Sequence, residues 1–336
     1  MTFFKDFDRQ QESSQPPWDD DSVVEGNPPE RKKGGIGWMV ISGAIFLLFL
    51  VASSIKGIYT DWLWFDNLGF SDLFLTPLLT RTWLFLAGAA LFFVLAMGNI
   101  ILARRLSPKP SESFVLGEGV VILARTLNML VLVGVAAFSF IMGSIVSEQW
   151  ESVLRFLNAK PFGVDTPVLG GDVSFYMFTV PVYRFIEMWL AGSLILILLG
   201  TLVVYGFNFG MNRFSLSFPA AVKGHLSALG AGIFLLLSWG YWLDIFDLAY
   251  SSRGVVFGPS YTDVHAQWFG FQILMVVAVI CAVLLVANVF RRGVRLPLIG
   301  IGLWIASGIV FAGIYPTMVQ KLEVEPNELG KERPYI

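Results

Sequence analysis

The amino-acid sequence predicts an all-α membrane protein, a polytopic bundle of about seven transmembrane helices. Hydrophobic residues make up 55% of the chain and charged residues only 14%, which is more apolar than a soluble domain requires. Seven apolar stretches contain no Asp, Glu, Lys, Arg or His. Each has close to the roughly 20 residues with which a helix, rising ~1.5 Å per residue, crosses the hydrocarbon layer.

The predicted spans together form a transmembrane domain that covers residues 36–319. Their bounds are residues 36–55, 83–103, 127–146, 188–207, 226–243, 268–290 and 296–319. The last span is rich in glycine, which allows close helix packing or irregular backbone.

The segment before the first span, residues 1–35, is rich in Asp, Ser, Gln, Glu and Pro. This composition predicts a disordered tail. A cleavable signal peptide is the alternative, because small residues at 52–54 follow the first apolar run. That run is too long and its leader too extended for such a peptide, so we predict an uncleaved anchor.

Cations in the short connections alternate from one side of the membrane to the other. Cytoplasmic loops carry the excess of Lys and Arg, so the richer side predicts a cytoplasmic N-terminus in the cell membrane and an extracytoplasmic C-terminus. That side would hold Arg31, Lys32, Lys33, Arg104, Arg105, Lys109, Arg125, Arg213, Lys223, Arg291, Arg292 and Arg295.

The outward connections are long and aromatic. Aromatic and acidic residues alternate over residues 59–72, which predicts an interfacial belt, with a ligand-binding pocket as the alternative. Between the third and fourth spans, apolar residues at helical spacing predict a short interfacial helix. Those residues are Trp150, Val153, Leu154 and Leu157.

Four charged residues border the fourth and fifth spans. Arg184 and Glu187, three apart, could pair on one helix face as a proton or substrate site. The simpler interpretation is that both extend to the interface. Asp244 and Asp247 are expected to cap the fifth helix and to meet water.

Asp263 and His265 lie in the most polar outward connection. On an extended segment they would project to the same side and could bind a divalent cation or act as an acid/base pair. Their spacing is not diagnostic, so we predict no catalytic, cofactor-binding or metal residue and no cofactor. All six charged residues stay polar site candidates.

Other features exclude several classes of function. The net charge of −2 gives no reason to expect nucleic-acid binding, and Cys281, the only cysteine, excludes an intrachain disulfide. The fifth span separates His225 from His265, so they cannot share one haem or metal, and both are expected to be solvated interfacial histidines. Asn99 and other amides could bond between helices.

Four segments outside the spans, taken together, resemble a known family. They are residues 61–70 (DWLWFDNLGF), 171–178 (GDVSFYMF), 253–258 (RGVVFG) with 261–266 (YTDVHA), and 324–336 (VEPNELGKERPYI). The chain is similar to uncharacterised protein family 0182, large bacterial integral-membrane proteins. The resemblance implies about seven helices followed by a larger extracytoplasmic region, of which residues 320–336 would be the start. It implies that this chain is truncated, and it brings no activity or site residue.

Three hypotheses of function follow. The charge-free spans and elaborate outward loops favour an anchor or scaffold that presents extracytoplasmic segments or binds a protein partner outside the lipid bilayer. A transporter or channel for an unidentified solute is the first alternative, although spans without ionisable residues argue against a proton relay. A membrane enzyme acting on a lipid or envelope substrate is the second.

Overall fold

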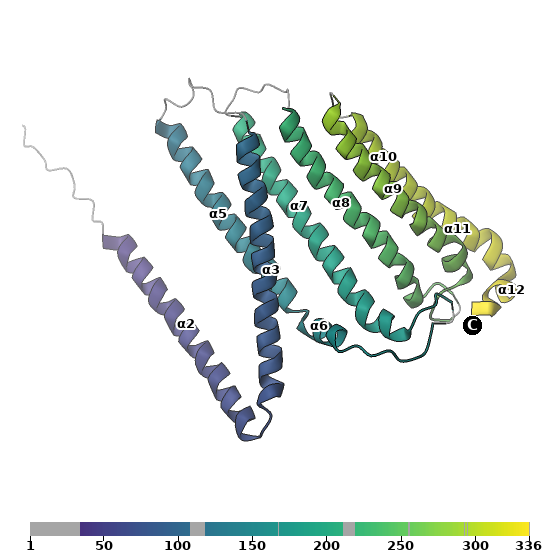
Figure 1. Ribbon diagram of the computed structural model, residues 1–336, viewed down its shortest axis with the longest axis horizontal. Coiled ribbons are helices and arrows are strands. Elements are labelled where there is room, and N and C mark those ends of the chain that lie inside the picture. The colour runs from purple at the N-terminus through teal and green to yellow at the C-terminus, as the bar shows by residue number, and fades with distance from the viewer. Residues whose placement is uncertain are drawn as a thin grey trace, which may run out of the picture. The chain divides into compact units, whose positions relative to one another are not determined.

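A computed structural model describes residues 34–107, 118–166, 168–210, 219–254, 256–291, 293 and 295–335 of the chain. Within these residues the regular secondary structure is helical, apart from an isolated β-bridge between Asp165 and Asp172. Seven helices are long and apolar enough to cross a membrane, which confirms the predicted all-α bundle (Figure 1). Residues 1–33, most of the predicted tail, lie outside the described residues, as do the cations Lys109, Arg213 and Arg292.

The chain divides into two compact units, Met1–Ser71 and Asp72–Ile336. The described part of the first unit is α2 (Gly34–Asn67) and the turn after it. The helix extends well past residue 55, so the aromatic segment expected in a loop begins as helix. No proline interrupts it, and it ends just before Gly69, whose φ of 75° glycine tolerates.

The second unit contains the remaining long helices. Most of them are longer than their predicted spans, because polar residues at the helix ends continue the backbone ladder beyond the apolar stretch. Short π-helical or 3₁₀ turns extend α7, α8 and α9. The helices are α3 (Ser71–Leu106), α5 (Glu118–Ser147), α7 (Val180–Gly210), α8 (Ala220–Asp247), α9 (Trp268–Ala287) and α10 (Arg295–Gly308).

The last span comprises 41 helical residues, Arg295–Tyr335, and its backbone turns at Asn327 (φ −143°, ψ 50°), where α12 (Glu328–Glu332) begins. It alternates α-helical and π-helical turns, with η5 (Ile309–Ile314) and η6 (Gln320–Val324) flanking α11 (Tyr315–Val319). Pro316 lacks an N–H donor and crowds the preceding turn, which explains the wide backbone before it. The segment after η6 contains a 3₁₀ turn (Glu325–Asn327) and α12.

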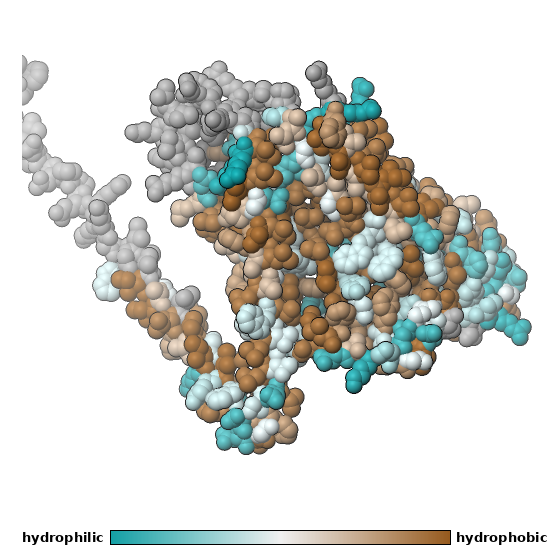
Figure 2. Space-filling view, viewed as in Figure 1, coloured by the Kyte–Doolittle hydropathy of each residue, from teal (hydrophilic) through white to brown (hydrophobic). Residues whose placement is uncertain are grey.

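Apolar side chains face outward along the helices. Leu, Ile, Val and Phe residues are widely exposed, for example Val203 at 59% and Val283 at 60%. Figure 2 shows brown, apolar side chains over the middle of these helices, with teal residues gathered mainly toward the helix ends. A bilayer is the environment that such a surface fits.

A buried histidine joins three helices of the second unit. His225 of α8 is only 7% exposed, which corrects the expectation of a solvated interfacial residue. Its Nδ1 lies 2.9 Å from the Tyr205 hydroxyl of α7, and its Nε2 lies 3.0 Å from Asn99 Oδ1 of α3. The predicted interhelical bond of Asn99 is thus confirmed.

The predicted short helix is α6 (Trp150–Leu157). Beyond it, the loop of residues 158–174 is organised by Asp172, whose carboxylate accepts bonds from the amides of Phe162 (3.1 Å), Gly163 (2.7 Å) and Ser174 (2.7 Å). Hydrogen bonds from the Ser174 hydroxyl and these amides stabilise the anion and lower the pKa of Asp172 well below its usual range.

We predict that acid loosens this loop. Because the folded-state pKa of Asp172 is lowered, its stabilisation is present above the unfolded pKa of about 4 and declines as the pH falls below it. Hydrogen exchange of residues 158–174, corrected for the intrinsic rate, should therefore rise at acid pH. In Asp172→Asn the loop should exchange faster at neutral pH and lose this acid dependence. An unchanged pH profile in the variant would contradict the assignment.

Close approach of α9 to η5 requires glycine at position 270. A Cβ placed there would lie 2.5 Å from the carbonyl oxygen of Phe311. Gly270→Ala should therefore lower the free energy of unfolding by about 1–3 kcal/mol, measured by denaturation in detergent. Gly192→Ala is the matched control, because open space surrounds its Cβ. Equal effects of the two substitutions would disprove the steric explanation.

Candidate functional site

Two polar networks lie at one end of the second unit. The first joins the N-terminal turns of α7 to the C-terminal turns of α8, and the second joins the residues just before α9 to the C-terminal segment from η6 to α12. Figure 1 shows α6, the end of α8 and α12 at this end. All six charged candidates from the sequence belong to these networks.

Arg184 is the centre of the first network. Its guanidinium lies 2.7 Å from the Asp244 carboxylate and 2.5 Å from that of Asp247, and it donates to the carbonyl oxygen of Gly240 at 3.3 Å. The planar group thus fastens α7 to the last turns of α8. The aspartates therefore have an interhelical partner, where the sequence predicted only a helix cap.

Glu187 is the most buried member of this network, with 6% of its surface exposed. Its nearest cation is Arg184 at 3.9 Å, longer than a hydrogen bond, and its Oε1 would lie 3.1 Å from a Cβ at position 240. Glycine at this position therefore makes room for the carboxyl group against α8. The expectation that Glu187 extends to the interface is wrong.

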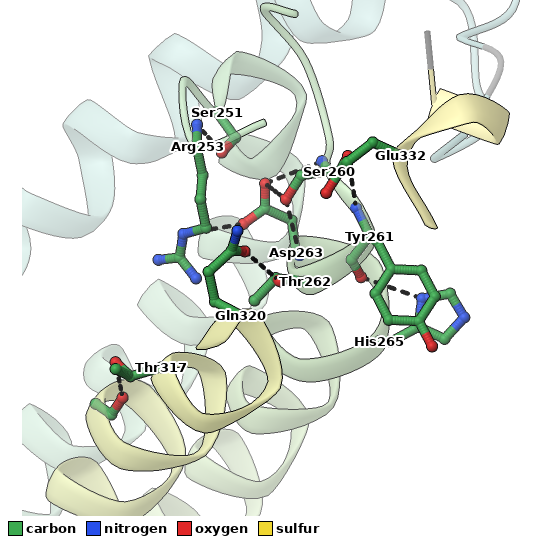
Figure 3. Close-up of polar contacts among 11 residues, drawn as sticks. Ser251, Arg253, Ser260, Tyr261, Thr262, Asp263, His265, Thr317, Gln320 and Glu332 are labelled. Carbon is green, nitrogen blue, oxygen red and sulfur yellow. Dashed lines mark hydrogen bonds and ion pairs between the residues drawn. The ribbon is translucent and has the colours of Figure 1, made fainter. Parts of the chain in front are cut away.

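Asp263 begins the second network and is fully buried at the start of the π turn η3 (Asp263–Gln267). Its Oδ2 accepts bonds from the Ser260 amide (3.0 Å) and hydroxyl (2.8 Å), while Arg253 Nε lies 3.8 Å from Oδ1 (Figure 3). The carboxylate closes the loop between α8 and α9. The extended segment expected here is helical instead, because Ser260 and Asp263 form a capping box: the Asp263 amide donates to the Ser260 hydroxyl at 3.3 Å while the Asp263 carboxylate accepts from the Ser260 amide.

His265 contacts Tyr261 instead of Asp263. Its ring stacks on that of Tyr261, with centroids 4.1 Å apart, and its Nδ1 lies 3.1 Å from the Tyr261 carbonyl oxygen. Figure 3 shows His265 beside Tyr261 and away from Asp263. Within the described residues, no group of three or more His, Cys, Asp or Glu side chains is arranged to hold a metal ion.

Residues that the sequence did not single out connect this loop to the C-terminal segment. Thr262 donates to Gln320 Oε1 at 2.5 Å, and the Tyr261 amide lies 3.4 Å from Glu332. Lys331 donates to the Tyr261 hydroxyl at 3.0 Å. The pairs are 58 to 71 residues apart in the chain, so no local pattern could have indicated them.

Glu332 is buried, with 3% of its surface exposed, although it belongs to the polar segment after the last span. Its side chain lies beside Ser260 and Tyr261 (Figure 3). A Cβ added to Gly254 would lie 3.4 Å from its Oε2 and 3.0 Å from the Ser260 Cβ, so the loop and α12 pack tightly.

Comparison with known proteins identifies the family. The model described as "Uncharacterised protein family (UPF0182)" matches residues 38–336. The chain belongs to this family. Similar UPF0182 proteins come from Moorella thermoacetica (38% identical over 86% of this chain and 33% of the relative), Frankia casuarinae (36%, 87% and 29%) and Desulforamulus reducens (31%, 91% and 35%).

This UPF0182 chain spans about a third of the length of the curated relatives it matches. No solved structure matches it.

We predict that Arg184 stabilises the fold through its three carboxylate neighbours. Arg184→Gln should lower the free energy of unfolding by roughly 1–3 kcal/mol, less than for a fully buried pair because Asp244 and Asp247 are partly exposed. Denaturation in detergent measures this change. The control is Arg155→Gln, whose exposed pair with Glu151 should contribute less than about 1 kcal/mol. An equal loss in both variants would exclude a special role for Arg184.

Proposed function

We propose that this part of the protein is a membrane scaffold that holds the segment of residues 320–335 in a fixed position. The observation that carries the proposal is the polar network between that segment and the loop before α9. By the distribution of cations, this end of the bundle is the extracytoplasmic side of a bacterial cell membrane.

The contacts in this network can fix the direction in which the segment of residues 320–335 leaves the bundle. The bonds of Gln320, Lys331 and Glu332 are spread over several helical turns, so the segment is held at both ends. A helix held at one point would pivot, whereas attachment at two separated points restrains its axis. The same bonds restrain Tyr261 and Thr262, at the end of the loop before α9.

The held segment presents apolar side chains to its surroundings. Leu322 is 67% exposed and Leu329 is 86% exposed. Exposed leucines on an anchored helix are typical of a surface that another protein segment covers. In this proposal the covering segment is an extracytoplasmic partner or further chain, consistent with relatives about three times as long.

The proposal predicts that breaking the network releases the segment. In Tyr261→Ala/Gln320→Ala, hydrogen exchange of residues 325–335 should rise roughly tenfold or more, the factor that ~1.4 kcal/mol of opening free energy produces. Thr317→Ala is the control, because its hydroxyl bonds only within its own helix, to Gly313. Unchanged exchange in the double variant would show that these contacts do not hold the segment.

A second measurement addresses the scaffold role itself. The full-length protein, purified from native membranes in mild detergent, should retain an extracytoplasmic protein partner, and the double variant should lose it. Solute uptake by the cells should stay normal. Absence of any partner from the wild-type protein would argue against binding to a separate protein.

Transport is the second candidate function, and the position of Glu187 favours it. Ionisable residues inside spans often serve ion pathways. Between Glu187 and Tyr205, α7 carries the buried hydroxyls of Ser193 and Thr201, which have no hydrogen-bond partner among the described residues. Proton flux into proteoliposomes, reported by an internal pH-sensitive dye, should then fall in Glu187→Gln and not in Glu151→Gln. Equal flux in all three proteins would exclude this path.

A further inference from the structure

An apolar cavity of about 320 Å³ lies between α3, α5 and α7. It is about twice the ~150 Å³ cavity that accommodates a benzene molecule. Every lining residue is apolar or glycine, and the lining on α3 runs from Phe92 to Ile100, about 12 Å along the helix axis. The cavity is therefore elongated parallel to the helices.

Two glycines create the width of the cavity. Gly134 of α5 and Gly200 of α7 both line it, and a Cβ at either position would meet no atom within 4 Å. Close packing therefore does not require these glycines, in contrast to Gly270. Any larger side chain at either position would project into open space.

The cavity has a buried floor and an exposed rim. Phe92, Ala96 and Val135 are at most 7% exposed, whereas Leu199 and Val203 on the rim are 54% and 59% exposed. The lining residues lie in the interior of candidate membrane spans. An opening at this position faces hydrocarbon, which contains acyl chains and no water.

A pair of cations lies beyond one end of the cavity. Ile100 lines that end, and Arg104 and Arg105 follow it by about one helical turn, roughly 6 Å of axial rise. Both arginines are exposed, and neither forms an ion pair with a carboxylate among the residues that the structure describes. A phosphate at the membrane surface would complement their charge.

We propose that this cavity binds one acyl chain of an anionic phospholipid, whose phosphate lies against Arg104 and Arg105. The apolar floor takes the chain, the rim opens to the bilayer, and the two arginines select the charge of the headgroup. The site is separate from the polar networks and does not depend on the scaffold proposal.

Photolabelling in vesicles tests the proposal. The probe is phosphatidylglycerol with a diazirine in one acyl chain, present as a minor component of phosphatidylcholine vesicles. Labelled peptides should include the cavity segments of α3, α5 and α7. Gly200→Leu and, on the facing helix, Gly134→Leu should abolish that labelling, because the new side chain fills the cavity. Two variants on different helices guard against a folding defect in either one.

The matched controls are Gly192→Leu and Gly98→Leu, which lie on the same helices as the cavity, in open space, and do not line it. Both should label as the wild type does. Equal labelling of the cavity segments in filling and control variants would overturn the site and leave only general lipid contact.

The headgroup is tested separately. Arg104→Gln/Arg105→Gln should weaken phosphatidylglycerol labelling by roughly 30-fold, since each of the two basic residues near the surface contributes about 1 kcal/mol. Labelling by the matching phosphatidylcholine probe should change little. If both probes label the wild type equally and neither responds to the arginine variant, selection of an anionic lipid is refuted.

Discussion

Within the hydrocarbon of a bilayer, each backbone N–H and C=O must find its hydrogen-bond partner inside the protein, because no water is present to supply one. A helix meets this requirement alone, so the long elements of the described chain are helices that continue beyond their apolar stretches. Even the irregular backbone near Pro316 remains helical, as π turns of the last span. Beyond the apolar stretch the backbone turns at Asn327 (φ −143°, ψ 50°), where α12 begins.

The same lack of water governs where the polar side chains lie. Arg184 is paired with carboxylates at the ends of α7 and α8, and His225 has a partner at each ring nitrogen. Buried charges that are paired stabilise the contact between helices, whereas an unpaired one would cost several kcal/mol. Two buried carboxylates are less well paired: the nearest cation to Glu187 is 3.9 Å away and shared with two aspartates, and Glu332 has one oxygen with no hydrogen-bond partner among the described residues.

The two proposals assign different parts of the second unit different tasks. At one end, the bonds around Tyr261 hold the C-terminal helix at separated points, an arrangement suited to presenting a neighbouring domain or partner. Toward the other end, the glycine-bordered cavity and the arginines after Ile100 form the site proposed to bind an anionic lipid. A lipid bound there would contact three helices at once and tie their packing to membrane composition.

The sequence by itself determined the fold class, the seven spans, the short helix after the third span and the family, because apolar length and periodicity are local properties. It also indicated Arg184, Glu187, Asp244, Asp247, Asp263 and His265 as polar candidates. Only the tertiary structure decided their partners: Arg184 bonds to aspartates 60 and 63 residues away, and Tyr261 to a lysine 70 residues away. Such pairs depend on which helices pack together and on how far each is shifted along its axis. The packing of many side chains decides both, and no local sequence pattern contains that information.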